Sequence, residues 1–304
     1  MGMLLAGWDG GGTGTTVVCI DPHGTVLARA RFGPLNLNGA EPEAVARTVW
    51  DCLGYMRAHG ECAALCIGAA GVSNPSAGAL LRRLLAQNGY GGRLVLAGDH
   101  EIALYGAVGG VGAVVIAGTG SICCGRNGLG QTARAGGGGH LIDDGGSGYA
   151  IGRDVLSAVL RAQDGRGPAT LLEAAVAAEL GGASRESIVS YVYRQQRQKA
   201  DIARFARLLA PALEAGDAAA EEIASRAAQE LYALLKAVLT RLRLPGADVA
   251  LMGSILEKCA PVRAEVEALI DAGLPAARII APRADAAQGA ALMAKLRWEE
   301  QCHG

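Results

Sequence analysis

The chain has 304 residues, and its 28 basic and 29 acidic side chains give a formal net charge of −1. This balance leaves no global field to attract nucleic acid or an anionic membrane. No apolar run approaches the ~20 residues that span a bilayer, and no basic stretch typical of a signal peptide opens the chain. We therefore expect no nucleic-acid partner, no membrane and a cytoplasmic location.

The first third of the chain predicts the order β-β-β-α-β-α-β-α. β-Branched and apolar runs bounded by Gly, Pro and Asp predict the strands, and apolar residues at helical spacing predict the helices. The expected strands cover 4–9, 15–21, 26–32, 64–72 and 93–99, and the expected helices cover 41–58, 76–88 and 100–107.

The same order begins again after residue 112. Strands are expected at 113–118, 121–125, 132–135, 249–254 and 277–282, and helices at 147–163, 258–271 and 285–298. An alanine-rich helical block fills about 169–243, and without it the two halves have the same element order. The pattern predicts an α/β protein of two duplicated lobes, 1–107 and 108–304, with a helical insertion in the second. The last helix is a candidate for packing back on the first lobe.

A glycine hairpin recurs between the first and second strands of each half, as G-G-T-G-T-T at 11–16 and A-G-T-G-S at 117–121. The first hairpin has neither the spacing of a P-loop nor that of a dinucleotide-binding fingerprint. Glycine lets successive backbone N–H groups approach a phosphate. We expect phosphate-binding loops that use Gly11, Gly12, Gly118 and Gly120, with hydroxyls from Thr13, Thr15 and Ser121.

Two aspartates end predicted strands. Asp9 follows a buried strand and could hold Mg²⁺ through water, because Mg²⁺ takes few carboxylates and keeps several waters; a simple capped turn is the alternative. Asp99 opens a helix, where it could be an N-cap, a general base for an attacking hydroxyl, or both.

Asp143, Asp144 and Ser147 lie in the glycine-rich run 136–148, just before a predicted helix. Anion binding at the helix N-terminus, recognition of sugar hydroxyls and simple capping all remain open for them. Asn36 and Asn38 lie in a loop, where their amides suit hydroxyl or acetamido recognition or ordinary turn chemistry.

The chain resembles the N-acetylglucosamine kinases of the BadF/BadG/BcrA/BcrD ATPase group, within the actin, Hsp70 and sugar-kinase superfamily. The resemblance rests on motifs in order along the chain, namely D-G-G-G-T-G-T at 9–15, Asn36, G-D at 98–99, G-T-G-S at 118–121, G-G-x-G-H-x-x-x-D-x-G-S at 136–147, M-G-S at 252–254 and Q-G-A-A at 288–291.

The resemblance implies ribonuclease H-like, actin-like ATPase lobes and transfer of phosphate from ATP to the 6-hydroxyl of N-acetylglucosamine. Asp9 and Thr13 would serve phosphate and Mg²⁺, with Asp144 as a second Mg²⁺ residue, both through water. Asp99 would be the base. The sugar would be bound by Asn36, Asp99, Ser121 and Asp144 and by the backbone of Gly137 and Gly139. Thr119, Gly253 and Ser254 would border the nucleotide, and the protein would be a homodimer.

The chain departs from the family pattern at three glycines. Gly14 replaces a common basic residue, which predicts one phosphate contact fewer, Gly138 replaces a Trp, and Gly145 replaces a Glu. Because Gly138 and Gly145 lie beside the proposed sugar site, glucosamine and N-acetylmuramic acid remain alternative substrates.

Two other functions compete with the kinase. The first is an ATP-driven activator of a radical dehydratase, whose iron–sulfur cluster would need thiolates such as Cys123 and Cys124. The eight cysteines lack a paired framework, however, and buried thiols in a reducing compartment are expected. The second is a non-catalytic sugar sensor, which the retention of Asp9, Asp99 and Asp144 argues against.

Overall fold

The computed structural model describes residues 2–35, 42–69, 71–72 and 74–302. The chain forms two compact units. Unit 1 comprises residues 1–111 and 282–304, and unit 2 comprises residues 112–281. In the part of the chain described, no helix combines the length and the apolar character needed to cross a membrane.

The sheet of unit 1 has five strands in the order β3-β2-β1-β4-β5. β1 pairs antiparallel with β2 and parallel with β4, β2 pairs antiparallel with β3, and β4 pairs parallel with β5. The strands are β1 (Met3–Gly10), β2 (Thr15–Ile20), β3 (Val26–Phe32), β4 (Glu61–Ala69) and β5 (Arg93–Ala97).

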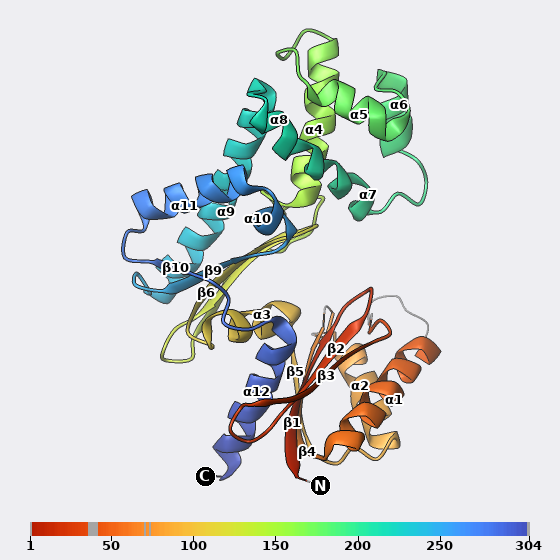
Figure 1. The fold of residues 1–304 in the computed structure, drawn as a ribbon, viewed down its shortest axis with the longest axis vertical. Helices are drawn as coiled ribbons and strands as arrows, with labels where there is room; N and C mark the ends of the chain where they lie inside the picture. The colour runs from red at the N-terminus through yellow and green to blue at the C-terminus, as the bar shows by residue number, and fades with distance from the viewer. Residues whose placement is uncertain (1, 36–41, 70, 73, 303–304) are drawn as a thin grey trace. The chain divides into compact units, whose positions relative to one another are not determined.

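Helices cover both faces of this sheet (Figure 1). α1 (Pro42–His59) and α2 (Pro75–Gln87) lie on one face, over a core that contains Trp8 and Leu65. α3 (Asp99–Val108) and α12 (Ala286–Cys302) lie on the other face, over a core that contains Leu5 and Cys66. The alternation of strand side chains divides the two cores.

The last helix, α12, belongs to unit 1, so the predicted second lobe does not extend to residue 304. Its buried side chains, at helical spacing, are Ala287, Ala290, Ala291 and Ala294. This stripe of small residues lets the helix lie close against β1, where a Cβ on Gly7 would be 2.7 Å from the carbonyl carbon of Ala290. The close packing brings the N-terminus of α12 to the end of β1 that carries Asp9.

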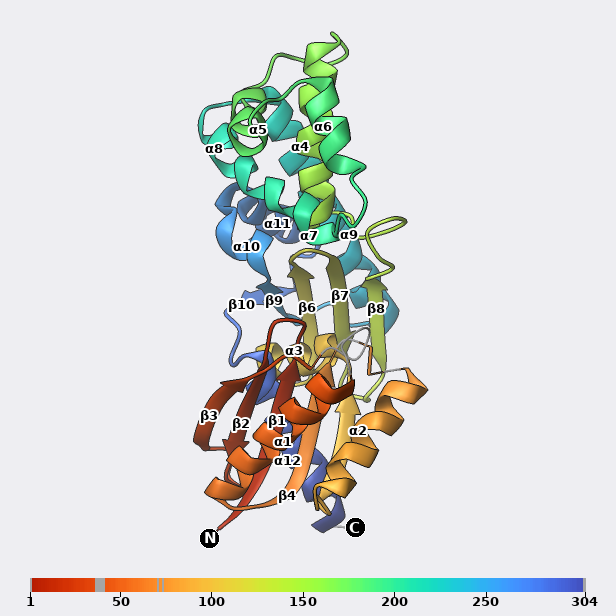
Figure 2. The same ribbon diagram turned by 90° about the vertical axis from the view of Figure 1, so that its right-hand side faces the viewer.

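The sheet of unit 2 repeats the arrangement, with the order β8-β7-β6-β9-β10 and the same parallel and antiparallel pairs. Figure 2 shows β6, β7 and β8 side by side. The strands are β6 (Gly112–Ala117), β7 (Ser121–Arg126), β8 (Thr132–Gly136), β9 (Asp248–Met252) and β10 (Arg278–Ile280). Two sheets of identical topology support the predicted duplication.

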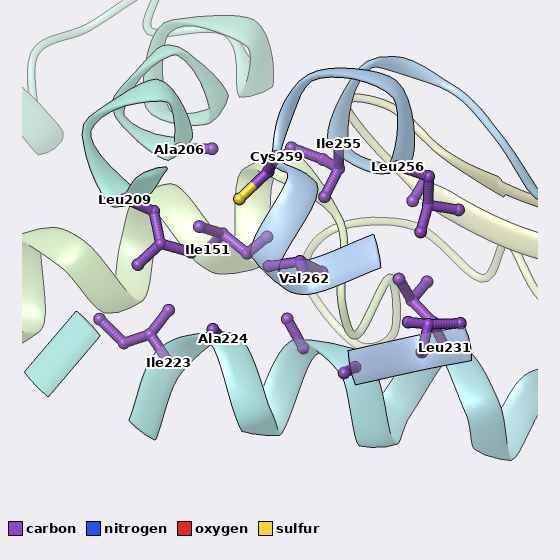
Figure 3. Close-up of a cluster of buried hydrophobic side chains, with 14 of the residues drawn as sticks. Ile151, Ala206, Leu209, Ile223, Ala224, Leu231, Ile255, Leu256, Cys259 and Val262 are labelled. Carbon is purple, nitrogen blue, oxygen red and sulfur yellow. The ribbon is translucent and has the colours of Figure 1, made fainter. Parts of the chain in front are cut away.

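The helices of unit 2 pack around one large core (Figure 3), to which Ile151, Ala224 and Val262 contribute from three different helices. The helices are α4 (Gly148–Gln163), α5 (Leu172–Leu180), α6 (Arg185–Val192), α7 (Lys199–Ala203), the 3₁₀ helix η1 (Arg204–Leu208), α8 (Leu209–Glu214), α9 (Ala218–Leu242), α10 (Ser254–Lys258) and α11 (Ala260–Gly273). The expected insertion at about 169–243 therefore corresponds to α5 through α9.

Candidate active site

The first glycine hairpin joins β1 to β2 and is closed by its own hydrogen bonds. The Gly11 amide donates to the Gly14 carbonyl at 2.9 Å. The Thr15 hydroxyl is buried and donates to the Gly33 carbonyl at 2.8 Å. The Gly11 amide and the Thr15 hydroxyl, both predicted to bind phosphate, are here hydrogen-bonded within the protein and hold the loop. Gly12 and Thr13 are exposed at the tip of the hairpin.

An acidic cluster lies on the face of the unit 1 sheet that α12 covers. Burial raises the pKa of Asp9 above its ordinary value of 3.8, the nearby carboxylates of Asp285 and Asp99 raise it further, and Arg29 lowers it in part. Asp285 caps α12 by accepting a hydrogen bond from the Gln288 amide at 3.0 Å, and it forms an ion pair with Arg29. Such a concentration of negative charge favours a bound cation.

The cluster fits Mg²⁺ held by one protein carboxylate. Over residues 2–302, apart from the undescribed gaps, no three acidic, histidine or cysteine side chains gather closely enough to enclose a metal. Mg²⁺ commonly takes one or two carboxylates and completes its shell with water and substrate phosphates. Asp9 is the carboxylate at the end of β1, so it is the residue here that would hold Mg²⁺ through water.

Asp99 is the first residue of α3 and is 58% exposed. The N-cap is Gly98, whose amide donates to Glu101 Oε2 at 2.6 Å, so of the two alternatives for Asp99 the N-cap is not the one that the structure shows. Asp99 Oδ1 accepts the His100 amide at 2.9 Å and lies 3.3 Å from His100 Nδ1. The hydrogen bond from the His100 side chain lowers the pKa of Asp99 below 3.8. The carboxylate is therefore ionised at neutral pH, as a general base must be.

The second glycine hairpin joins β6 to β7 in unit 2 and is fastened to the start of α4. The Gly118 amide donates to the Gly120 carbonyl at 2.9 Å, and the Gly118 carbonyl accepts the Gly148 amide at 2.7 Å. The Tyr149 amide donates to the Thr119 carbonyl at 3.2 Å. The Gly118 amide, like that of Gly11, therefore closes its own turn and is not available to a phosphate.

Asp144 packs against this second hairpin. It is 4% exposed and adopts a left-handed backbone with φ 61°. Its Oδ1 lies 3.4 Å from the Ser121 amide, and a Cβ on Gly120 would be 2.9 Å from its Oδ2. The Ser121 hydroxyl donates to the Gly145 carbonyl at 2.6 Å. The structure brings Ser121 and Asp144 together, and their contacts hold the loop in place.

Gly253 lies beside the same hairpin because β9 runs parallel to β6, with Met252 opposite Ile116. Its φ of 95° favours glycine, and an added Cβ would be 2.6 Å from the Ala117 carbonyl oxygen. The Gly253 amide donates to Glu257 Oε1 at 2.9 Å. Gly253 and Ser254 therefore follow β9 beside Ala117, the last residue of β6 before the hairpin that contains Thr119 and Gly120.

The glycine-rich run after β8 folds back on itself. The Gly137 amide donates to the Ser121 carbonyl at 2.9 Å, and the Gly138 amide donates to Asp143 Oδ2 at 2.9 Å. The Gly139 carbonyl accepts the Asp143 amide at 2.9 Å. Ser147 Oγ accepts the Ala150 amide at 3.1 Å, which makes it the N-cap of α4. Asn36, the remaining predicted sugar residue, and its neighbour Asn38 lie outside the described residues.

Three charged residues that lie near predicted site residues were not themselves predicted from the sequence. Arg29 and Asp285 are 256 positions apart. Arg29 occupies the polar face of an alternating strand, and Asp285 directly precedes a helix. The local sequence therefore indicated only an exposed strand residue and a helix cap. Glu230 lies on α9, in the block interpreted as scaffold, and its Oε2 would be 2.7 Å from a Cβ on Gly145.

Two lobes of the same strand order, each with a glycine hairpin after its first strand, define the class of actin-like ATPase folds. A family model described as the BadF/BadG/BcrA/BcrD ATPase family matches residues 6–294. The chain belongs to this family, which confirms the family and the fold predicted from the sequence.

Two relatives match almost from end to end. One is an N-acetylmuramic acid/N-acetylglucosamine kinase of Clostridium acetobutylicum, 35% identical over 299 residues, covering 96% of this chain and 98% of the relative. The other is an N-acetyl-D-glucosamine kinase of Dictyostelium discoideum, 29% identical over 312 residues, covering 96% and 97%. The solved structure of a putative N-acetylglucosamine kinase from Chromobacterium violaceum is similar with a TM-score of 0.76, 28% identity and coverage of 96% and 98%.

Proposed function

We propose that the protein is an ATP-dependent amino-sugar kinase that phosphorylates the 6-hydroxyl of N-acetylglucosamine. The observation that carries the proposal is the end-to-end similarity to the Clostridium kinase, whose name gives N-acetylmuramic acid and N-acetylglucosamine as substrates. The exposed, ionised Asp99 at the start of α3 supplies a carboxylate of the kind that the reaction requires. N-acetylmuramic acid and glucosamine are the substrates that compete with N-acetylglucosamine.

In this proposal Asp99 orients the sugar hydroxyl and accepts its proton as the phosphoryl group is transferred. Phosphoryl transfer depends mainly on positioning and on neutralising phosphate charge. Mg²⁺, when bound through Asp9, supplies positive charge to the phosphates. The exposed tip of the first hairpin, with the amides and hydroxyl of Gly12 and Thr13, orients them. Thr119, Gly253 and Ser254 border the nucleotide in unit 2, and Gly139 and Asp144 contribute to sugar binding there.

The proposal also includes a homodimer and a cytoplasmic location, as expected for this family. Iron–sulfur chemistry is less well supported, because Cys123 points into the core of unit 2 and is fully buried. That burial raises the pKa of the Cys123 thiol well above its ordinary value. A thiol of this kind is packed like a small apolar residue and is poorly placed to bind a cluster at a subunit axis.

The test is ADP release in a coupled assay with Mg·ATP and a panel of N-acetylglucosamine, N-acetylmuramic acid and glucosamine. We expect turnover with N-acetylglucosamine and none with its 6-deoxy analogue, which lacks the accepting hydroxyl. Asp99→Asn is expected to lower kcat by at least about a hundredfold, a typical contribution of a general base. The control is Asp51→Asn on the exposed side of α1. An undiminished rate in Asp99→Asn would reject Asp99 as the base, and absence of turnover with every hexosamine would reject the function.

A further inference from the structure

A second arginine of β3, Arg31, lies beside the tip of the first glycine hairpin. Its Nη2 is 3.4 Å from the Thr13 hydroxyl oxygen, and its side chain is exposed. The strand register places Asp9, Thr16 and Arg31 opposite one another across β1, β2 and β3. Residues opposite one another point to the same face of a sheet, so Arg31 shares the face of Asp9.

Gly14 makes room for this guanidinium group. Its φ lies outside the left-handed region, so the backbone conformation does not require glycine at this position. A Cβ on Gly14 would be 2.7 Å from Arg31 Nε and 3.1 Å from Arg31 Nη2. A Cβ on Gly12, two residues earlier, would meet nothing within 4 Å. The absence of a side chain at position 14 therefore leaves the space that the Arg31 guanidinium group occupies.

Arg29 and Arg31 have different surroundings although they share one strand face. Arg29 forms an ion pair with Asp285, so an acidic side chain already balances its charge. Arg31 contacts the neutral hydroxyl of Thr13. A guanidinium group presents a planar set of donors that matches two phosphate oxygens at once, and a nearby hydroxyl and glycine amides add further donors.

We propose that Arg31 binds the polyphosphate of the nucleotide, together with Thr13 and the amides at the tip of the hairpin. The inference rests on the proposed function to the extent that the ligand is a nucleotide triphosphate. It assigns the positive charge of this loop to a side chain of the neighbouring strand. The hairpin therefore acquires a phosphate-binding cation that its own sequence does not contain.

The test measures equilibrium binding of Mg·ATP, Mg·ADP and AMP by calorimetry, with no sugar present. Arg31→Ala is expected to weaken Mg·ATP binding by at least about tenfold, the scale of one charge-assisted hydrogen-bonded pair, and to leave AMP binding within about twofold. Arg31→Lys should give an intermediate loss, because an ammonium group keeps the charge without the planar fork. Arg82→Ala, at an exposed position of α2, is the matched control.

A double-mutant cycle separates phosphate binding from a structural role. Gly14→Arg alone should weaken Mg·ATP binding, because the new side chain competes with Arg31 for space. In the Arg31→Ala background the same change should restore much of the lost affinity. The proposal is overturned if Arg31→Ala changes ATP and AMP binding equally, or if Gly14→Arg is equally harmful in both backgrounds. Because no sugar is present, these results stand whether or not a hexosamine is phosphorylated.

Discussion

The packing of α12 on α3 makes the substitution Gly289→Ala a sharp test of the fold of unit 1. In an ordinary helix interior this change would stabilise the protein by about 1 kcal/mol, because alanine has the higher helix propensity. Here the new Cβ would overlap the Ile102 carbonyl oxygen and lie 2.9 Å from the Cα of Gly106. Both neighbours are backbone atoms of α3, so no side chain can turn aside to relieve the overlap.

The two helices would have to separate until these contacts reach the 3.4 Å at which ordinary Cβ contacts begin. Overpacking of a well-packed core costs about 1–3 kcal/mol, and rigid backbone neighbours place this case at the upper end. After the gain in propensity, we expect a net loss of about 2 kcal/mol in the free energy of unfolding. The displacement should also move Asp285 away from Arg29.

The assay is urea unfolding followed by tryptophan fluorescence. The chain has three tryptophans, and Trp8, Trp50 and Trp298 all belong to unit 1, so the signal reports this unit alone. The matched control is Gly54→Ala in α1, where an added Cβ meets nothing within 4 Å. This control should gain up to about 1 kcal/mol. If Gly289→Ala proves as stable as the original protein, the close packing of α12 on α3 is refuted.

Three further predictions concern charged groups. His100→Ala removes the hydrogen bond that lowers the pKa of Asp99. Since the ionised form is the base, the acidic limb of the kcat/KM–pH profile should move to higher pH. An unmoved limb would contradict the role of His100. Burial opposes the charge of Asp217, but hydrogen bonds from backbone amides outweigh it and lower its pKa below 3.8, so Asp217→Ala, which also removes the N-cap of α9, should cost about 1–2 kcal/mol at neutral pH. That cost should shrink as pH falls below 3.8 through the folded-state pKa. Urea titrations at neutral and acid pH would measure it, and an equal cost at both pH values would contradict the prediction. Gly145→Ala should displace Glu230 and raise the KM for the sugar several-fold while leaving Mg·ATP binding unchanged, and steady-state kinetics would count against this if the KM for ATP rose instead.

Much of the fold could be predicted because element order depends on local patterns. The run V-L-A-R-A-R-F predicts a half-solvated strand, and β3 spans Val26–Phe32 with its two arginines on one face. For the last helix, packing on the first lobe was one candidate, and no local pattern could decide it. Its alanine stripe fits any flat surface of small residues, and only the three-dimensional structure shows that Gly7 and Gly106 provide that surface.

The position of a candidate site residue could be predicted where its local setting is distinctive, and less so where its contacts depend on distant partners. Asp9 and Asp99 were predicted as carboxylates that follow apolar runs, and the structure places Asp99 and Asp285 near Asp9. The hydroxyl of Thr15 was expected to face a ligand, but it donates to the Gly33 carbonyl. Hydroxyl groups satisfy whichever acceptor the fold brings nearest, and sequence spacing does not reveal that acceptor.

The Asp285–Arg29 pair shows the same limit at longer range. Each residue has an ordinary local interpretation, as a helix cap and as an exposed strand residue. Their ion pair forms only because α12 returns to the first sheet after the whole of unit 2. No pattern within either segment carries that information.

The division of unit 1 into two segments has a consequence for how the protein is made. Residues 112–281 are contiguous, so unit 2 can fold as soon as that stretch leaves the ribosome. Unit 1 begins first, yet the helix that covers Leu5, Val18 and Cys66 is synthesised after all of unit 2. Domains usually complete folding in the order of synthesis. Here α3 covers part of this apolar sheet face from the start, and the rest of the face is completed only when α12 has been translated.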